Sequence, residues 1–136
     1  MNYVLSVADK VAEYTDTDDR ILTFTPVFAL QADRELVPGT LMELFTFFPT
    51  WETERAEKYK VLNLSMLLDY LSTRQAGAVV LTEERFFSSK YMGKVLDKYR
   101  PEILKVLDEN YYLAEKIFYP PEIGRGSVYI YLPRQK

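Results

Sequence analysis

The residues AVVLT, from Ala78 to Thr82, are the strongest indication of the fold, because they are continuously apolar over the length of one strand. A strand with one face in water alternates apolar and polar residues, whereas a strand covered on both faces reads as an unbroken apolar run. The stretch follows a break at Gln75 to Gly77 and precedes the charged residues Glu83 to Arg85. It therefore predicts the central strand of a small sheet that carries helices on both faces.

Toward the N-terminus, the hydrophobic spacing predicts two helices and one further strand. Apolar residues from Val4 to Ala12 recur at helical spacing, with charged residues on the opposite face. The residues from Ile21 to Thr25 alternate and are rich in β formers, which predicts a strand. A Leu-rich helix is expected from Leu62 to about Arg74, with Asn63 as its cap and Gly77 as a left-handed end.

The segments between these elements give weaker patterns. We interpret Phe28 to Asp33 as a short helix or turn, followed by a break at Pro38-Gly39. The residues from Thr40 to Phe48 are very apolar for a loop and suggest a helix that packs over the sheet edge. The strongly charged residues from Trp51 to Lys60 suggest a solvated segment.

Toward the C-terminus, the pattern predicts a helix pair and then two strands. The residues from Phe86 to Tyr99 are helical in character, and Pro101 is expected to begin a further helix that ends at Asn110. The residues Tyr111 to Tyr119 and Ser127 to Leu132 read as strands, separated by prolines and glycines that are typical of a longer hairpin loop.

This order of elements predicts one three-layer α/β domain over residues 1–136. Its small, mainly parallel sheet should have right-handed crossovers and an antiparallel C-terminal hairpin at one edge. The arrangement is Rossmann-like, so a nucleotide site has to be tested. The glycines stand at positions 39, 77, 93, 124 and 126, and none forms the phosphate-binding loop after the first strand. The sequence therefore predicts no nucleotide cofactor.

Composition excludes several classes of function. The chain has 17 Lys+Arg and 20 Asp+Glu, interspersed, which is unlike the basic stripe of a nucleic-acid binder. It has no Cys and no His, which rules out disulfides, thiolate metal sites and catalytic dyads built on His within the chain. No run approaches the roughly 20 apolar residues that a membrane span needs, and no signal peptide is predicted. The compartment stays open.

The candidate polar contacts lie after the predicted parallel strands, where ligands bind in open α/β sheets. Asp33 and Arg34 follow the first strand, and a buried Arg34 could hold a phosphate or carboxylate. The favoured alternative is an internal salt bridge that fixes the loop. Arg85 follows the central strand together with two acids, for which a role at a helix start is the simpler interpretation. Other paired acids, such as Asp18-Asp19, suit a solvated turn.

An aromatic cluster is formed by Phe47, Phe48 and the only tryptophan, Trp51. If exposed, such a cluster would suggest a surface for a sugar, a lipid or a partner protein. If buried, it is simply part of the core, and the sequence leaves both interpretations open. The tyrosines from Tyr111 to Tyr131 are explained most simply by strand alternation, because few basic residues accompany them.

Several phrases of the sequence resemble one membrane-protein family. A first helix is followed by Asp18 to Ile21, a strand, and then Ala29, Ala32 and Arg34; Pro38-Gly39 and Met42 to Phe48 come next. The central strand and the stretch Asn110 to Leu113 continue the likeness. This pattern resembles the soluble C-terminal domain of multi-spanning membrane glycosyltransferases related to dolichyl-phosphate-mannose–protein mannosyltransferases and aminoarabinose transferases.

The resemblance implies an extracytoplasmic accessory domain, excised from a larger membrane protein that uses a lipid-linked sugar. The catalytic acid of that family lies in a loop near the first membrane span, which is not in this sequence, so no catalytic residue is carried over. Its expected partners are the transmembrane part of the parent transferase and a lipid-linked sugar or acceptor, with no cofactor, metal or nucleic acid. The candidate contacts are Asp33, Arg34, Phe47, Phe48, Trp51 and Arg85. The alternative is a free-standing, cytoplasmic binding module without catalytic activity.

Overall fold

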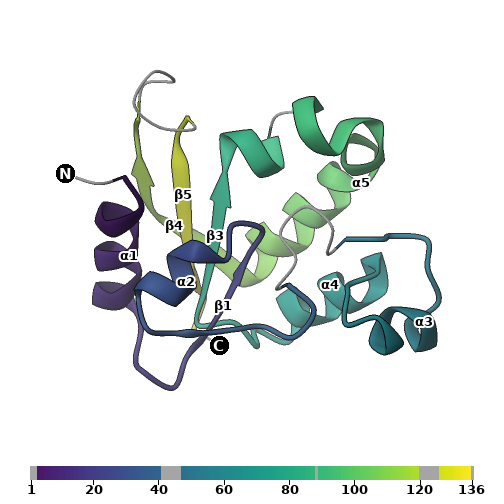
Figure 1. The fold of residues 1–136 in the computed structure, drawn as a ribbon, viewed down its shortest axis with the longest axis horizontal. Coiled ribbons are helices and arrows are strands. Elements are labelled where there is room, and N and C mark those ends of the chain that lie inside the picture. Colours follow the sequence, from purple (N-terminus) through teal and green to yellow (C-terminus); the bar gives the residue numbers. More distant parts are fainter. Residues whose placement is uncertain (1–2, 41–46, 88, 120–125, 136) are drawn as a thin grey trace.

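The computed structural model describes residues 3–40, 47–87, 89–119 and 126–135, and its elements form a five-stranded mixed sheet with helices around it (Figure 1). The strands are β1 (Arg20–Thr23), β2 (Glu35–Leu36), β3 (Ala78–Thr82), β4 (Tyr111–Ile117) and β5 (Val128–Pro133). The α-helices are α1 (Tyr3–Tyr14), α2 (Val27–Gln31), α3 (Thr53–Lys58), α4 (Leu64–Ser72) and α5 (Ser89–Asn110). A π-helical turn, η2 (Glu83–Phe87), follows β3.

The strands follow the order β2-β1-β3-β5-β4, so β3 occupies the centre of the sheet. β1 pairs in parallel with β2 and with β3, whereas β5 runs antiparallel to β3 and to β4. The predicted central strand, the parallel first strands and the antiparallel C-terminal hairpin are therefore confirmed. The fold class is α/β, as the sequence indicated.

Alternate residues of the central strands face two separate cores. Ala78 and Val80 of β3 face the core that α1 and α2 cover, together with Phe28. Val79 and Leu81 face the core that α4 and α5 cover. Figure 1 shows α1 on one side of the sheet and α4 and α5 on the other. The prediction of helices on both faces is thus confirmed.

The predicted helix pair is wrong, because α5 continues from Ser89 through Pro101 to Asn110. A proline inside a helix removes one backbone hydrogen bond, but its φ angle is compatible with the helix. Ile103 and Leu107, both after the proline, are buried in the same core as α4. This burial outweighs the lost hydrogen bond, so the helix does not restart.

The charged segment before α4 contains a helix that the sequence analysis missed. α3 is mostly exposed and buries only Ala56, so its hydrophobic pattern is too weak to predict. The cap predicted at Asn63 is confirmed, since its Oδ1 accepts a hydrogen bond from the N–H of Met66 at 2.7 Å. The Nδ2 of Asn63 also donates to the carbonyl of Trp51 at 3.0 Å and to the hydroxyl of Thr53 at 3.1 Å. One side chain therefore ties the start of α3 to the start of α4.

Left-handed residues end three of the described helices, and none of them is glycine. Asp33, Lys60 and Arg74 have φ angles of 56°, 57° and 53°. After α3, the N–H of Lys60 donates to Glu57 and the N–H of Val61 donates to Ala56, which is the Schellman pattern. The same pair of bonds closes α2 and α4.

The left-handed end expected at Gly77 is therefore wrong, since Arg74 takes that role. Gly77 is required for a different reason, namely close contact with the loop before β1. A Cβ atom at Gly77 would lie 2.4 Å from Cγ of Asp19, and the N–H of Gly77 donates to the carbonyl of Arg20 at 2.8 Å.

Tyr111 anchors the start of β4 in the core on the α4 and α5 side. Its ring is fully buried, and its hydroxyl donates to the carbonyl of Ala76 at 2.8 Å. Burial raises the pKa of Tyr111 to about 12, against the opposing effect of the nearby positive charge of Arg74. The hydroxyl is therefore neutral in the folded chain well above the ordinary range of tyrosine.

We expect Lys60→Gly to raise the free energy of unfolding by roughly 1 kcal/mol, because glycine adopts a positive φ without the steric cost that a Cβ atom brings. Urea denaturation at neutral pH measures this change. Lys60→Ala is the control, since it removes the ammonium group but keeps the Cβ atom. An equal gain from both variants would show that the charge, and not the backbone, is responsible.

Tyr111 should also contribute to alkaline unfolding. Its pKa is about 12 in the folded chain and 10.0 in the reference state, so its contribution is complete below pH 10 and is lost as the pH rises toward 12. We expect Tyr111→Phe to lower stability at pH 7 by about 1–2 kcal/mol, since the carbonyl of Ala76 loses its donor. The variant should also lose less stability between pH 9 and pH 11 than the wild type in urea titrations. Tyr112→Phe, at an exposed neighbour, should change neither property.

Candidate functional site

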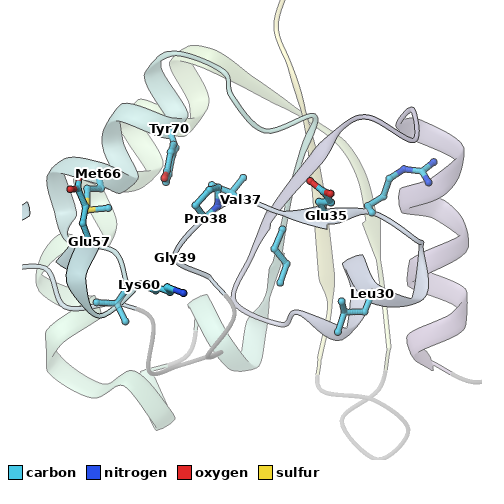
Figure 2. A pocket seen from close by; sticks show the side chains of 12 residues that line it. Leu30, Glu35, Val37, Pro38, Gly39, Glu57, Lys60, Met66 and Tyr70 are labelled. Atoms are coloured by element: carbon cyan, nitrogen blue, oxygen red, sulfur yellow. The ribbon is translucent and has the colours of Figure 1, made fainter. Parts of the chain in front are cut away.

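A groove of about 720 Å³ lies along the outer edge of β2. One wall is the chain from α2 through β2 to the turn at Gly39, and the other consists of the end of α3 and the exposed side of α4. Figure 2 shows Tyr70 and Met66 across the groove from Val37 and Pro38. The lining residues are Leu30, Arg34, Glu35, Leu36, Val37, Pro38, Gly39, Glu57, Lys60, Val61, Met66 and Tyr70.

Two backbone features set the positions of the groove walls. Gly39 has a φ of 92°, and a Cβ atom there would lie 2.9 Å from Cδ2 of Leu62, so only glycine fits this turn without displacement. On the opposite wall, the left-handed Lys60 directs the chain from α3 into Val61 and Leu62. The turn at Pro38-Gly39, which the sequence shows as a break, is therefore part of the site.

The lining is mainly apolar, and charged groups stand at its rim. Leu30 is 61% exposed although it is apolar, and Met66 and Tyr70 are half-buried. Partial burial raises the pKa of Tyr70, and the negative charges of Asp69 and Glu57 raise it further, against the opposing effect of Arg20. Two carboxylates therefore act on the same end of the groove. This combination of apolar walls and a few charged groups is typical of binding sites.

Arg34 closes the end of α1 and is not free to hold a ligand. Its Nε donates to the hydroxyl of Thr15 at 3.0 Å, and its Nη2 donates to the carbonyls of Thr15 at 3.1 Å and Ala12 at 3.3 Å. Its Nη1 donates to the carbonyls of Ala32 at 3.0 Å and Asp33 at 3.3 Å. The favoured interpretation of an internal structural role fits this geometry, but the partners are carbonyl and hydroxyl oxygens rather than the expected carboxylate. The other candidate of this pair, Asp33, is exposed at the left-handed end of α2.

The aromatic candidates separate into a buried and a half-buried part. Phe47 is 4% exposed and contacts Phe24 in the core, with ring centres 6.3 Å apart. Phe48 stacks on Trp51 at 4.2 Å, and the guanidinium of Arg55 lies 3.9 Å from the centre of the Trp51 ring. Because two groups at these distances would collide on one face, they lie on opposite faces of the indole. Trp51 therefore offers no open face on which a sugar ring could stack. The rest of the apolar segment, residues 41–46, lies outside the described residues.

Aromatic residues follow both strands at the place where doubly wound sheets bind nucleotides. That place is the crevice beyond the carboxyl ends of neighbouring parallel strands that lead to opposite sides, here β1 and β3. Phe24, which follows β1, stacks on Phe86 of η2 with the ring centres 6.2 Å apart. Arg85 lies in the same π-helical turn, but its side chain is outside the described residues. Among the residues described after β3, Glu83 accepts a hydrogen bond from the hydroxyl of Tyr129 at 2.9 Å.

Within the described ranges, no three Asp or Glu residues come together in a way that could hold a metal ion. None of the helices seen in this part of the chain is both long and apolar enough to span a bilayer.

Sequence analysis missed most of the groove, because its lining comes from segments that are distant in the chain. Leu36 belongs to an edge strand too short to show alternation, and Val37 directly follows that strand. Met66 and Tyr70 look like ordinary positions of an amphipathic helix, and Glu57 belongs to the segment interpreted as solvated. The turn at Pro38-Gly39 and the candidate contact Arg34 were the local signals of the groove in the sequence.

We expect Arg34→Lys to lower the free energy of unfolding by roughly 2 kcal/mol. A lysine ammonium cannot reproduce the planar fork of donors, so partly buried carbonyls at the end of α1 lose their partners. Thermal and urea unfolding measure this loss. Arg20→Lys is the matched control, since Arg20 is half-exposed and its Nε lies 3.7 Å from a carboxylate oxygen of Glu35 at the surface. Equal stability of the two variants would contradict the structural role of Arg34.

Comparisons of the chain with protein-family models, with curated proteins and with solved structures found no match.

Proposed function

We propose that this chain is an accessory, extracytoplasmic domain of a membrane glycosyltransferase that transfers a sugar from a lipid-linked donor. In this proposal the catalytic site lies outside the chain, in the transmembrane part of the parent protein. The domain helps to position the acceptor beside that site, and the groove along β2 is the surface that it uses.

The observation that carries the proposal is the position of the groove. Phe24 and Phe86 are buried and stack just after the two parallel strands at whose ends open α/β sheets hold a cofactor, whereas the groove is open at the sheet edge. Its walls are mainly apolar and its charged groups stand at the rim, which suits the binding of an amphipathic group or a neighbouring polypeptide. The resemblance of the sequence to the C-terminal domains of such transferases supplies the reaction class.

The same groove favours a second candidate, a free-standing binding module without catalytic activity, located in the cytoplasm. A binding groove suits either role and does not distinguish the two candidates. The reading frame upstream of this sequence distinguishes them. A reading frame that continues upstream through many apolar spans supports the transferase. A start codon with its ribosome-binding site directly before Met1 contradicts it.

A transfer assay tests the role of the groove. Membranes from cells that express the full reading frame are given a polyprenyl-phosphate sugar with a radiolabel on the sugar, and transfer to the acceptor fraction is measured. We expect Met66→Lys to lower transfer by about tenfold at equal protein level, because the ammonium group enters an apolar wall.

Glu54→Gln is the matched control for this assay. It makes the same change of one charge unit on the exposed side of α3, outside the groove lining. It should leave transfer unchanged. Unaltered transfer by Met66→Lys would show that the groove has no role in transfer. The absence of label transfer in every membrane preparation would reject the proposed transferase itself.

A further inference from the structure

β2 leaves one backbone edge open toward the groove. Among the described residues, β2 pairs with β1 alone, with Ile21 opposite Leu36. The N–H of Val37 donates to the carbonyl of Ile21 at 3.0 Å. In a parallel ladder this pattern means that Ile21 bonds to the residues on either side of Leu36. The N–H and C=O of Leu36 therefore point away from β1, to the side on which the groove lies.

The open edge is short and has a fixed register. Residues of a strand alternate between its two sides, so the next backbone group on the groove side belongs to Pro38. Proline has no N–H, so it offers only its carbonyl. A strand added here would find one donor and one acceptor at Leu36 and one acceptor at Pro38. The other sheet edge, β4, has an irregularity between Leu113 and Glu115 that interrupts regular pairing.

The groove next to this edge provides room for side chains. Its volume of about 720 Å³ extends between β2 and α4, and Figure 2 shows Tyr70 and Met66 facing Val37 and Pro38 across it. An extended peptide places alternate side chains on opposite sides, so one of them would enter this apolar space. A lipid chain would fill the apolar space but would leave the donor of Leu36 without a partner.

The far end of the groove is acidic. A second hollow of about 310 Å³ adjoins it, because both are lined by Glu57, Met66 and Tyr70, and it adds Asp69. Glu35, on the β2 side, already faces Arg20 at 3.7 Å, and the positive charge of Arg34 lies at the other end of the groove, where its donors bond to the end of α1. Glu57 and Asp69 thus outnumber Lys60 around the space where the side chain of a bound peptide would emerge.

We propose that the groove binds an extended segment of another polypeptide chain by strand addition to β2. The backbone of the segment pairs with Leu36, an apolar side chain packs against Met66 and Tyr70, and a Lys or Arg of the segment reaches Glu57 and Asp69. This inference rests on the groove being the binding surface, as proposed above, but it does not require that the chain belong to a transferase.

The test uses the whole 136-residue chain and a defined peptide set. The probes are fluorescein-labelled heptapeptides of alternating Val and Thr with one Lys, the same peptides with Gln in place of Lys, and versions with N-methylated backbones. Fluorescence polarisation gives the affinities, and amide hydrogen exchange of Leu36 reports the pairing. Neutral detergent micelles are included as an apolar competitor.

We expect peptides with Lys to bind, and N-methylation on one set of alternate residues to weaken binding by about tenfold through lost hydrogen bonds. The amide of Leu36 should exchange more slowly in the complex. Leu36→Pro removes a donor that β1 does not use and should weaken binding similarly. Met66→Lys, on the opposite wall of the groove, should also weaken binding, because it places a charge where the apolar side chain of the peptide packs. Glu57→Gln should reduce the preference for Lys over Gln, because Asp69 is then the remaining partner, whereas Glu54→Gln should preserve it in full.

Three results would overturn strand addition. They are the absence of binding by every peptide at millimolar concentration, equal affinity of the N-methylated peptides, and displacement of the peptides by micelles without protection of Leu36. None of these results bears on label transfer in the membrane assay, so the failure of this inference is distinguishable from that of the proposed transferase.

Discussion

Burial of β3 on both faces is the constraint on which the rest of the structure depends. Val80 is fully buried under α1 and α2, and Leu81 is nearly so under α4 and α5. Each buried aliphatic side chain of this kind contributes about 1.5–3 kcal/mol. Because β3 contributes residues to both cores, the strand joins them into one folding unit. The same requirement places the short strand β2 at the far edge, where no further strand within the described residues covers it.

The ends of two short helices determine where the groove lies. The left-handed Asp33 directs the chain from α2 into β2, and the left-handed Lys60 directs it from α3 into Val61 and on toward α4. Non-glycine residues adopt this conformation only at a steric cost, which the paired hydrogen bonds of each helix end offset. Arg34 reinforces the first of these turns by tying it to the end of α1. The walls of the groove are therefore held by backbone geometry as well as by packing.

The elements with strong local patterns were predictable, whereas those that depend on distant contacts were not. The spacing of α1 and α4, the apolar run of β3 and the cap at Asn63 were all visible in the sequence. The helix break expected at Pro101 was wrong, because burial of Ile103 and Leu107 in the shared core keeps α5 continuous. The helix α3 was missed because it buries a single residue. The sequence left open whether the aromatic cluster from Phe47 to Trp51 is buried or exposed, and the structure shows Phe47 buried in the core and Phe48 and Trp51 half-buried.

Hydrophobic periodicity over a few neighbouring residues was sufficient to predict the fold class, the central strand and the C-terminal hairpin. The tertiary structure was needed to show which surface is open. Leu36, Glu57 and Tyr70 are separated by many residues along the chain, and they line one groove only because β2 lies at the sheet edge beside α3 and α4. It also decided the role of Arg34, whose donors are bonded to carbonyls of α1 that no local pattern places nearby. Local residue patterns specify secondary structure and burial, but the meeting of distant backbone edges and side chains is a property of the assembled core.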